Sequence, residues 1–183
     1  VGQGAKFYLN SIGNAPTVGI VGEADPVSSN VLGAEELDIY GYVGKETARF
    51  KTGATARDIA VSVNAIESKT GVVASASTHA RLALQPDNSI DGFTNIAFDL
   101  YGMNTTAIPI TASVKFGTGN NSAYPDLADL RDKINGFSGD TGINAKLSAD
   151  GSYLDLTSPD GYDITIDNFD LPLQSDTAYN TRK

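Results

Sequence analysis

His79 is the only histidine in the chain, so any proton-transfer chemistry near neutral pH would depend on it first. A Ser-His-Asp triad or a histidine-based metal site would need this residue. No second histidine and no cysteine is present to complete a zinc site. A general base also needs an orienting partner, and the segment Ser77–Leu84 around His79 indicates none. We expect His79 to be a turn or surface residue beside a strand, and we assign no catalytic residue.

An aspartate-rich segment near the C-terminus is the second candidate site. Several carboxylates together are what Ca²⁺ prefers, and a pair of them could act in glycoside hydrolysis. However, the spacing does not match an EF-hand loop, and the chain has no tryptophan to stack on a sugar. We expect a solvated face of strands, with calcium binding as the alternative, and we assign no metal and no other cofactor. The residues are Asp150, Asp155, Asp160, Asp163, Asp167 and Asp170.

Glycine-rich and hydroxyl-rich stretches give weaker signals. In the segment 41–46, Lys45 is followed by Glu46 where a phosphate-binding loop needs Ser or Thr, so we expect a turn between strands. Asn-X-Ser/Thr patterns begin at Asn104 and Asn120. Other hydroxyls lie in stretches that we expect to be exposed loops, and we interpret them as loop polarity, with sugar attachment as the alternative. These hydroxyls belong to Ser28, Ser29, Thr105, Thr106 and Ser122.

Composition excludes several classes of function. The net charge of -9, with no Lys/Arg run, argues against nucleic-acid binding. No apolar stretch approaches the ~20 residues that cross a bilayer, so we expect no membrane partner. The first ten residues lack the pattern of a signal peptide. The absence of cysteine excludes disulfides and cysteine nucleophiles, and it is compatible both with the cytosol and with export of an unfolded chain.

An internal repeat indicates how the chain is organised. The segment Asp58–Val72 aligns without a gap on Asp129–Ile143, and Asn64, Thr70 and Gly71 match Asn135, Thr141 and Gly142. The apolar positions are four and three residues apart, which predicts two amphipathic helices of about three turns. Thr55 and Asp58 predict a capping box, Pro125 suits the first turn of the second helix, and the two glycines mark the helix ends. The apolar positions are Ile59, Val63 and Ile66, matched by Leu130, Ile134 and Phe137.

Alternating segments flank both helices and predict strands. Before the helices these are Leu37–Val43 and Phe98–Gly102, and after them Arg81–Leu84, Tyr153–Leu156, Asn95–Phe98 and Asp163–Ile166. One strand could close the first unit and open the second. The fold class is therefore α+β, with two related β-(β)-α-β-β units, each a small, mainly antiparallel sheet with one packed helix. We expect units at 36–96 and 97–170, a strand and loop segment at 1–35, in which Lys6–Leu9 could be the strand, and a linker-like tail at 171–183.

This pattern resembles the flagellin hook IN motif: a helix that begins with Asp and has Asn in its last turn, followed by Thr-Gly and a β-hairpin. It occurs here as DIAVSVNAIESKTGVVASAS and as the closer copy DLRDKINGFSGDTGINAKLS, in which Gly136 stands where the first copy has Ala65. Together the copies cover roughly Leu37–Ile166. Flagellins and hook-associated proteins carry this motif in their variable outer regions. The long coiled-coil ends of flagellin have no counterpart here, so the sequence looks like an outer portion without its core segments.

The resemblance implies a structural role rather than an enzymatic one. It implies an outward-facing domain of a flagellin subunit in the extracellular flagellum, used in motility, whose partners are other flagellin subunits joined through core segments absent here. Host or glycan surfaces are further partners that the outer position implies. By itself the fragment should be a monomer. Two alternatives stay open: a hook-associated or filament cap protein domain, and a cell-surface adhesin that binds glycan.

Overall fold

A computed structural model of the chain describes residues 33–84, 92–117 and 125–171, together with the backbone of residues 6–11. The described elements run β1 (Lys6–Ser11), β2 (Glu35–Tyr40), β3 (Lys45–Phe50), α1 (Ala56–Asn64), α2 (Glu67–Thr70), β4 (Val73–Leu82), β5 (Gly92–Tyr101), β6 (Ile108–Phe116), α3 (Ala128–Gly136), α4 (Ser138–Thr141), β7 (Asn144–Leu147), β8 (Leu154–Ser158) and β9 (Thr165–Asp170). The α+β class is confirmed, and Lys6–Leu9 lies in β1. The expected loop at 12–30 and the expected tail beyond Leu171 lie outside the described residues.

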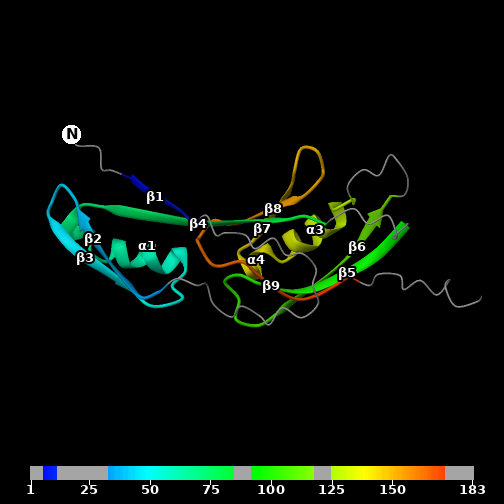
Figure 1. The fold of residues 1–183 in the computed structure, drawn as a ribbon, viewed down its shortest axis with the longest axis horizontal. Coiled ribbons are helices and arrows are strands. Elements are labelled where there is room, and N and C mark those ends of the chain that lie inside the picture. Colours follow the sequence, from blue (N-terminus) through cyan, green and yellow to red (C-terminus); the bar gives the residue numbers. More distant parts are fainter. Residues whose placement is uncertain (1–5, 12–32, 85–91, 118–124, 172–183) are drawn as a thin grey trace, which may run out of the picture.

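The described elements form an elongated molecule with one helix near each end (Figure 1). We call β2, β3, α1 and α2 with the first half of β4 the first unit, and β5 to β9 with α3 and α4 the second unit. β2 pairs with β3 in a two-stranded sheet, and β5 is the central strand of the order β6-β5-β9. All of these pairings are antiparallel.

Strand β4 connects the two units. Its first half, Val73–Thr78, pairs in parallel with β1, and its second half, Thr78–Leu82, pairs antiparallel with β8 of the second unit. β8 also pairs with β7, which gives the order β1-β4-β8-β7. The long strand therefore runs from one end of the molecule into the sheet of the other (Figure 1).

The strand expected to be shared between the units belongs to one sheet only. Asn95–Phe98 and Phe98–Gly102 are parts of the single strand β5, apart from Gly102, and β5 pairs with β6 and β9. The second unit therefore has the expected β-β-α-β-β order followed by β9. The first unit has β-β-α-β in its described part, because the chain leaves β4 to enter the second unit.

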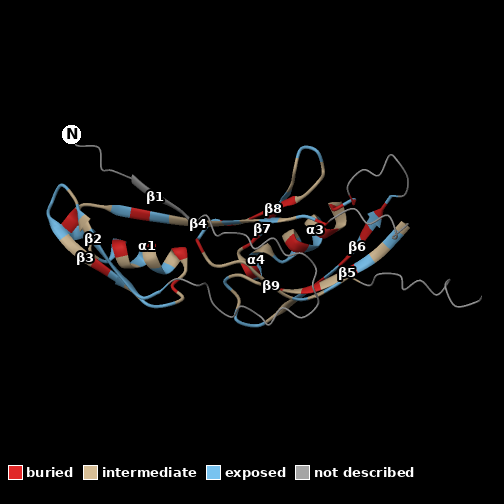
Figure 2. Cartoon of the chain, in the orientation of Figure 1, coloured by how far each residue is buried: buried red, intermediate tan, exposed pale blue. Residues whose placement is uncertain are grey.

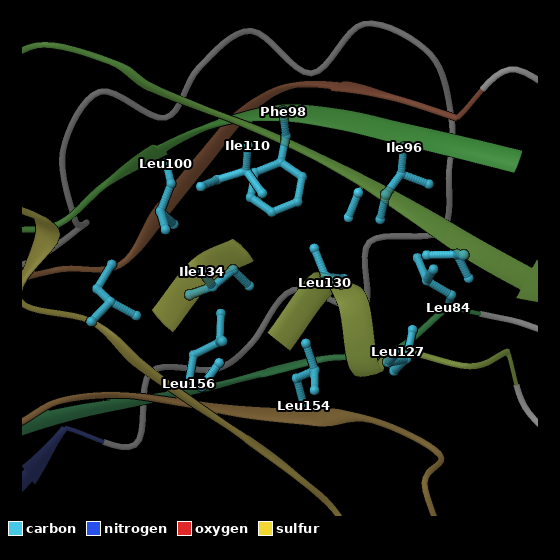
Figure 3. Close-up of a cluster of buried hydrophobic side chains, with 14 of the residues drawn as sticks. Leu84, Ile96, Phe98, Leu100, Ile110, Leu127, Leu130, Ile134, Leu154 and Leu156 are labelled. Carbon is cyan, nitrogen blue, oxygen red and sulfur yellow. The ribbon is translucent and has the colours of Figure 1, made fainter. Parts of the chain in front are cut away.

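Each helix packs between strands of two sheets. α1 contacts β3 on one side and β4 on the other, and α3 contacts β6 and β7 in the same way. The second unit holds the larger core, in which Leu130 and Ile134 of α3 lie between Phe98 and Ile110 on one side and Leu154 and Leu156 on the other (Figure 3). The core of the first unit is smaller and consists of Ala48, Ala60, Val63 and Ala74 with partly buried neighbours. Buried segments accordingly concentrate in the second unit (Figure 2).

The helix starts agree with the sequence in one unit and differ in the other. Thr55 caps α1 in a full capping box: the Asp58 amide donates to its hydroxyl at 3.1 Å, and the Thr55 amide donates to the Asp58 carboxylate at 2.9 Å. The first-turn role expected for Pro125 is wrong. Pro125 is buried two residues before the N-cap Leu127, because Asp126 is held there by a backbone hydrogen bond to β6 and the helix begins only at Ala128.

Each helix is also interrupted before its terminal glycine. α1 ends at Asn64 and α3 at Gly136, and a separate turn of helix follows in each unit as α2 and α4. Phe137 at this break is 38% exposed although its spacing predicts the buried face, whereas the matching Ile66 packs against the core of the first unit. Leu130 and Ile134, which precede the break, are fully buried.

Candidate functional site

His79 lies on β4 itself and is exposed. Its Nδ1 lies 3.2 Å from the hydroxyl oxygen of Thr157, and its Nε2 lies 3.2 Å from that of Ser77. A triad needs a carboxylate that orients the ring, and in the described part of the chain both partners are hydroxyls. The surface position is confirmed, and the arrangement offers no activated nucleophile.

The six aspartates do not converge on one point. Asp150 lies in the turn between β7 and β8, Asp155 lies on β8, and Asp167 and Asp170 lie on β9. Asp155 is 3.7 Å from Nε of Arg81, so it has its own counter-charge. Within the described ranges, no group of three His, Cys, Asp or Glu residues is placed to hold a metal ion.

Asp150 organises its own turn instead. Its Oδ1 accepts hydrogen bonds from the hydroxyls of Ser148 and Ser152, each at 2.7 Å, and from the Ser152 amide at 3.1 Å. These bonds, the one from Ser148 first, stabilise the carboxylate and lower the pKa of Asp150 from 3.8 to about 2. Its charge therefore helps to close the β7–β8 hairpin.

The remaining candidate residues are turn residues where they are described. The Gly41 amide donates to the Gly44 carbonyl at 2.9 Å, so residues 41–44 form the expected β2–β3 turn, and Lys45 begins β3. The side-chain nitrogen of Asn104 donates to the carbonyls of Leu100 and Thr106, and its oxygen accepts from the Gly102 amide. Thr105 and Thr106 are exposed. Ser28, Ser29, Asn120 and Ser122 lie outside the described residues.

The repeated residues Asn64 and Asn135 each join a helix to the following strand. The amide of Asn64 bonds to both backbone groups of Ala74, donating to the carbonyl at 2.9 Å and accepting from the N–H at 2.7 Å. Asn135 makes the same two bonds to Ala145, at 2.9 Å and 2.7 Å. Because the side-chain amide satisfies both backbone groups, the strand starts at a fixed position against the helix.

Threonine and glycine form the rest of this junction. The hydroxyl of Thr70 donates to the Ile66 carbonyl and accepts from the Val72 amide, and Thr141 repeats both bonds with Phe137 and Ile143. Both threonines are fully buried. Gly71 and Gly142 follow with φ of 73° and 69°, a left-handed conformation that glycine adopts without steric cost.

A second pair of glycines completes the junction; the sequence indicated that their two strands correspond, but it did not reveal the role of these glycines. A Cβ on Gly41 would overlap the carbonyl of Thr70, and a Cβ on Gly102 would overlap that of Thr141. The same carbonyls accept hydrogen bonds from the amides of Val43 and Met103. The signal was present as Asp-Ile-Tyr-Gly at 38–41 and Asp-Leu-Tyr-Gly at 99–102. It lies outside the ungapped helix alignment because the two units have different spacing between strand and helix.

We call this arrangement of two glycines, one threonine and one asparagine the IN junction. The hydrogen bonds of the Asn and Thr side chains are the same in both copies, which confirms the duplication at the level of structure. The amide that donates to the Thr carbonyl differs: it lies two residues after Gly41 in the first copy and one residue after Gly102 in the second. Its Asn and Thr side chains bond to backbone groups, so the junction positions strands against the helix. It is a structural site.

Comparison with known families agrees with this geometry. The family model of the flagellin hook IN motif matches the chain at residues 36–88 and again at 95–160, one match for each unit. The chain belongs to this family, and it is a flagellin-related structural domain of the bacterial flagellum. No curated protein matches it significantly. In the described part of the chain, no helix has the length and apolar character needed to cross a bilayer.

Proposed function

We propose that the chain is the surface-exposed outer domain of a flagellin subunit in the motility filament, where it meets solvent and neighbouring subunits. The observation that carries this proposal is the pair of IN junctions, one in each of two units joined by β4. A duplicated motif that uses its polar groups internally makes a rigid spacer. A spacer of this kind suits a part that projects from an assembly.

Surface charge supports the same position. The chain has a net charge of -9, and its described acidic side chains lie mainly on exposed strands and turns. Subunits repeated along a filament place many copies of this charge near one another. The resulting repulsion between filaments opposes lateral association, which favours an outward position over a buried one.

Immunogold electron microscopy of the source cells tests the proposal. Antibodies raised against residues 33–171 should place gold along the whole length of the filament. Gold confined to the hook junction or the filament tip would replace the proposal with a hook-associated or cap protein. Gold on the cell body beside unlabelled filaments would identify a cell-surface protein.

A further inference from the structure

An open cavity at the far end of the first unit is lined partly by Asn64 and Gly71 of the IN junction and partly by side chains that the junction does not use. It has a volume of about 410 Å³ and lies between the β2–β3 turn and the end of α1 with the start of α2. Tyr42 and Val43 come from the turn, and Asn64, Ala65, Glu67, Ser68 and Gly71 come from the helical side.

Tyr42 is the dominant feature of this cavity. Its ring packs against Gly71, where an added Cβ would overlap the ring. The rest of the tyrosine side chain faces solvent, since the residue is 83% exposed. Val43 beside it is 54% exposed. A tyrosine supported on one side and open on the other presents a rigid apolar surface with a polar tip.

Asn64 of the cavity lining is bonded to Ala74, which leaves Glu67 and Ser68 as the polar side chains that a ligand could engage. Glu67 and Ser68 are exposed, and no hydrogen bond or ion pair engages their side chains in the described part of the chain. The neighbouring Lys69 is held 2.7 Å from Glu46 and points its charge there. A carboxylate and a hydroxyl therefore face the cavity without a cation among its lining residues.

The second unit supplies an internal comparison. In the same register, Met103 takes the place of Tyr42 over the junction glycine, and Ser138 and Gly139 take the places of Glu67 and Ser68. The side-chain hydrogen bonds of the junction Asn and Thr are nevertheless the same in both units. The fold is thus formed without an aromatic ring or a carboxylate at these positions, so their presence in the first unit calls for another explanation.

We propose that this cavity binds a neutral saccharide, whose ring stacks on Tyr42 while its hydroxyls donate to Glu67 and exchange hydrogen bonds with Ser68. The lining decides the class of ligand. An anion would face Glu67 and the net charge of -9, and a divalent cation would find one carboxylate only. A wholly apolar ligand would leave the polar half of the cavity unpaired. Stacking on an aromatic ring with hydrogen bonds at the rim suits a sugar.

The test uses ¹H–¹⁵N NMR titration of the full 183-residue chain with chitotriose, with maltotriose and with the anionic 3′-sialyllactose. We expect at least one neutral trisaccharide to bind, with shifts concentrated at residues 42–43 and 64–71, and the anionic sugar to bind more weakly. Tyr42→Ala should weaken binding by about tenfold or more, because the stacking surface is lost. Glu67→Gln should weaken it less, and Met103→Ala, the matched change in the second unit, should leave it unchanged.

Three results would overturn the proposal. These are no binding of either neutral sugar, equal binding by the Tyr42→Ala variant, and shifts that fall outside the cavity. Both tyrosine and methionine occur naturally at this position of the two junctions, so Tyr42→Met serves as a second variant that retains the fold. A negative result here leaves the filament proposal unaffected, because immunogold labelling does not depend on sugar binding.

Discussion

Replacing Asn135 with alanine tests the role of the IN junction most sharply. The substitution removes both hydrogen bonds to Ala145, which is 7% exposed, so its N–H and carbonyl lose their partners in a nearly buried position. Each unsatisfied buried backbone group costs about 1–3 kcal/mol. Alanine has a higher helix propensity than asparagine, which stabilises α3 by roughly 0.6 kcal/mol and offsets part of this cost. For the two groups together, less this gain, the expected net loss is about 1.5–5.5 kcal/mol.

Thermal and urea unfolding followed by circular dichroism measures this change. A loss of this size should lower Tm by roughly 3–20 °C in a domain of this length. Asn144→Ala is the control, because Asn144 is exposed, lies on β7 beside Ala145 and is no part of the junction. If Asn135→Ala costs no more than Asn144→Ala, the junction does not hold the helix to the strand and the reasoning fails.

Further predictions follow from the same structure. Gly102→Ala should destabilise the fold by about 2–3 kcal/mol or more in urea unfolding, because its Cβ would overlap the Thr141 carbonyl, whereas Gly117→Ala, with open space around it, should change little. Phe98→Ala should cost roughly 3–5 kcal/mol, since Phe98 is 3% exposed and its ring stacks on Phe169 at 5.8 Å; an unchanged urea midpoint would contradict the core assignment. The hydrogen bond from Lys45, followed by that from Thr47, lowers the pKa of Asp38 below 3.8, so its contribution is present above about pH 4 and is lost as the pH falls through the lower folded value. Asp38→Asn should therefore show a smaller loss of stability between pH 4 and pH 2 than the unchanged chain, and parallel pH profiles would refute this.

The sequence predicted the helices, their register and the repeat, because these depend on local spacing. Val63, Leu130 and Ile134 lie on the buried face as their period requires, and Thr55 with Asp58 forms the expected cap. The break after Asn64 and after Gly136 was missed. An interrupted helix and a continuous helix have the same spacing of apolar residues. Periodicity therefore could not show that the helix stops where the Asn side-chain amide bonds to the next strand.

The pairing of β4 could not be predicted from the sequence. Its alternation indicates a strand, but the choice of β1 and β8 as neighbours depends on how the two units meet. Two contacts join the units beside β4. The Arg57 amide at the start of α1 donates to the Gly161 carbonyl at 3.0 Å, and the Arg57 guanidinium lies 4.8 Å from the centre of the Tyr162 ring. These residues are about 100 positions apart, beyond the reach of any local pattern.

Among the candidate sites, the sequence predicted an exposed position for His79 and a turn between β2 and β3, and the structure has both. It could not locate the cavity at Tyr42. The residues of that cavity are unremarkable in the sequence, and they come together only because the β2–β3 turn folds over Gly71. The turn is brought over Gly71 by the close approach of Gly41 to the Thr70 carbonyl, a tertiary contact that local sequence patterns do not show.

Helical reconstruction of filaments by cryo-electron microscopy tests the central claim most directly. Filaments should be taken from cells that produce the protein containing this chain. The account predicts elongated density of two connected lobes projecting from the filament at every subunit, into which residues 33–171 fit with both IN junctions in place. Filaments whose outer density is absent, or cannot accommodate the two units joined by β4, would contradict it.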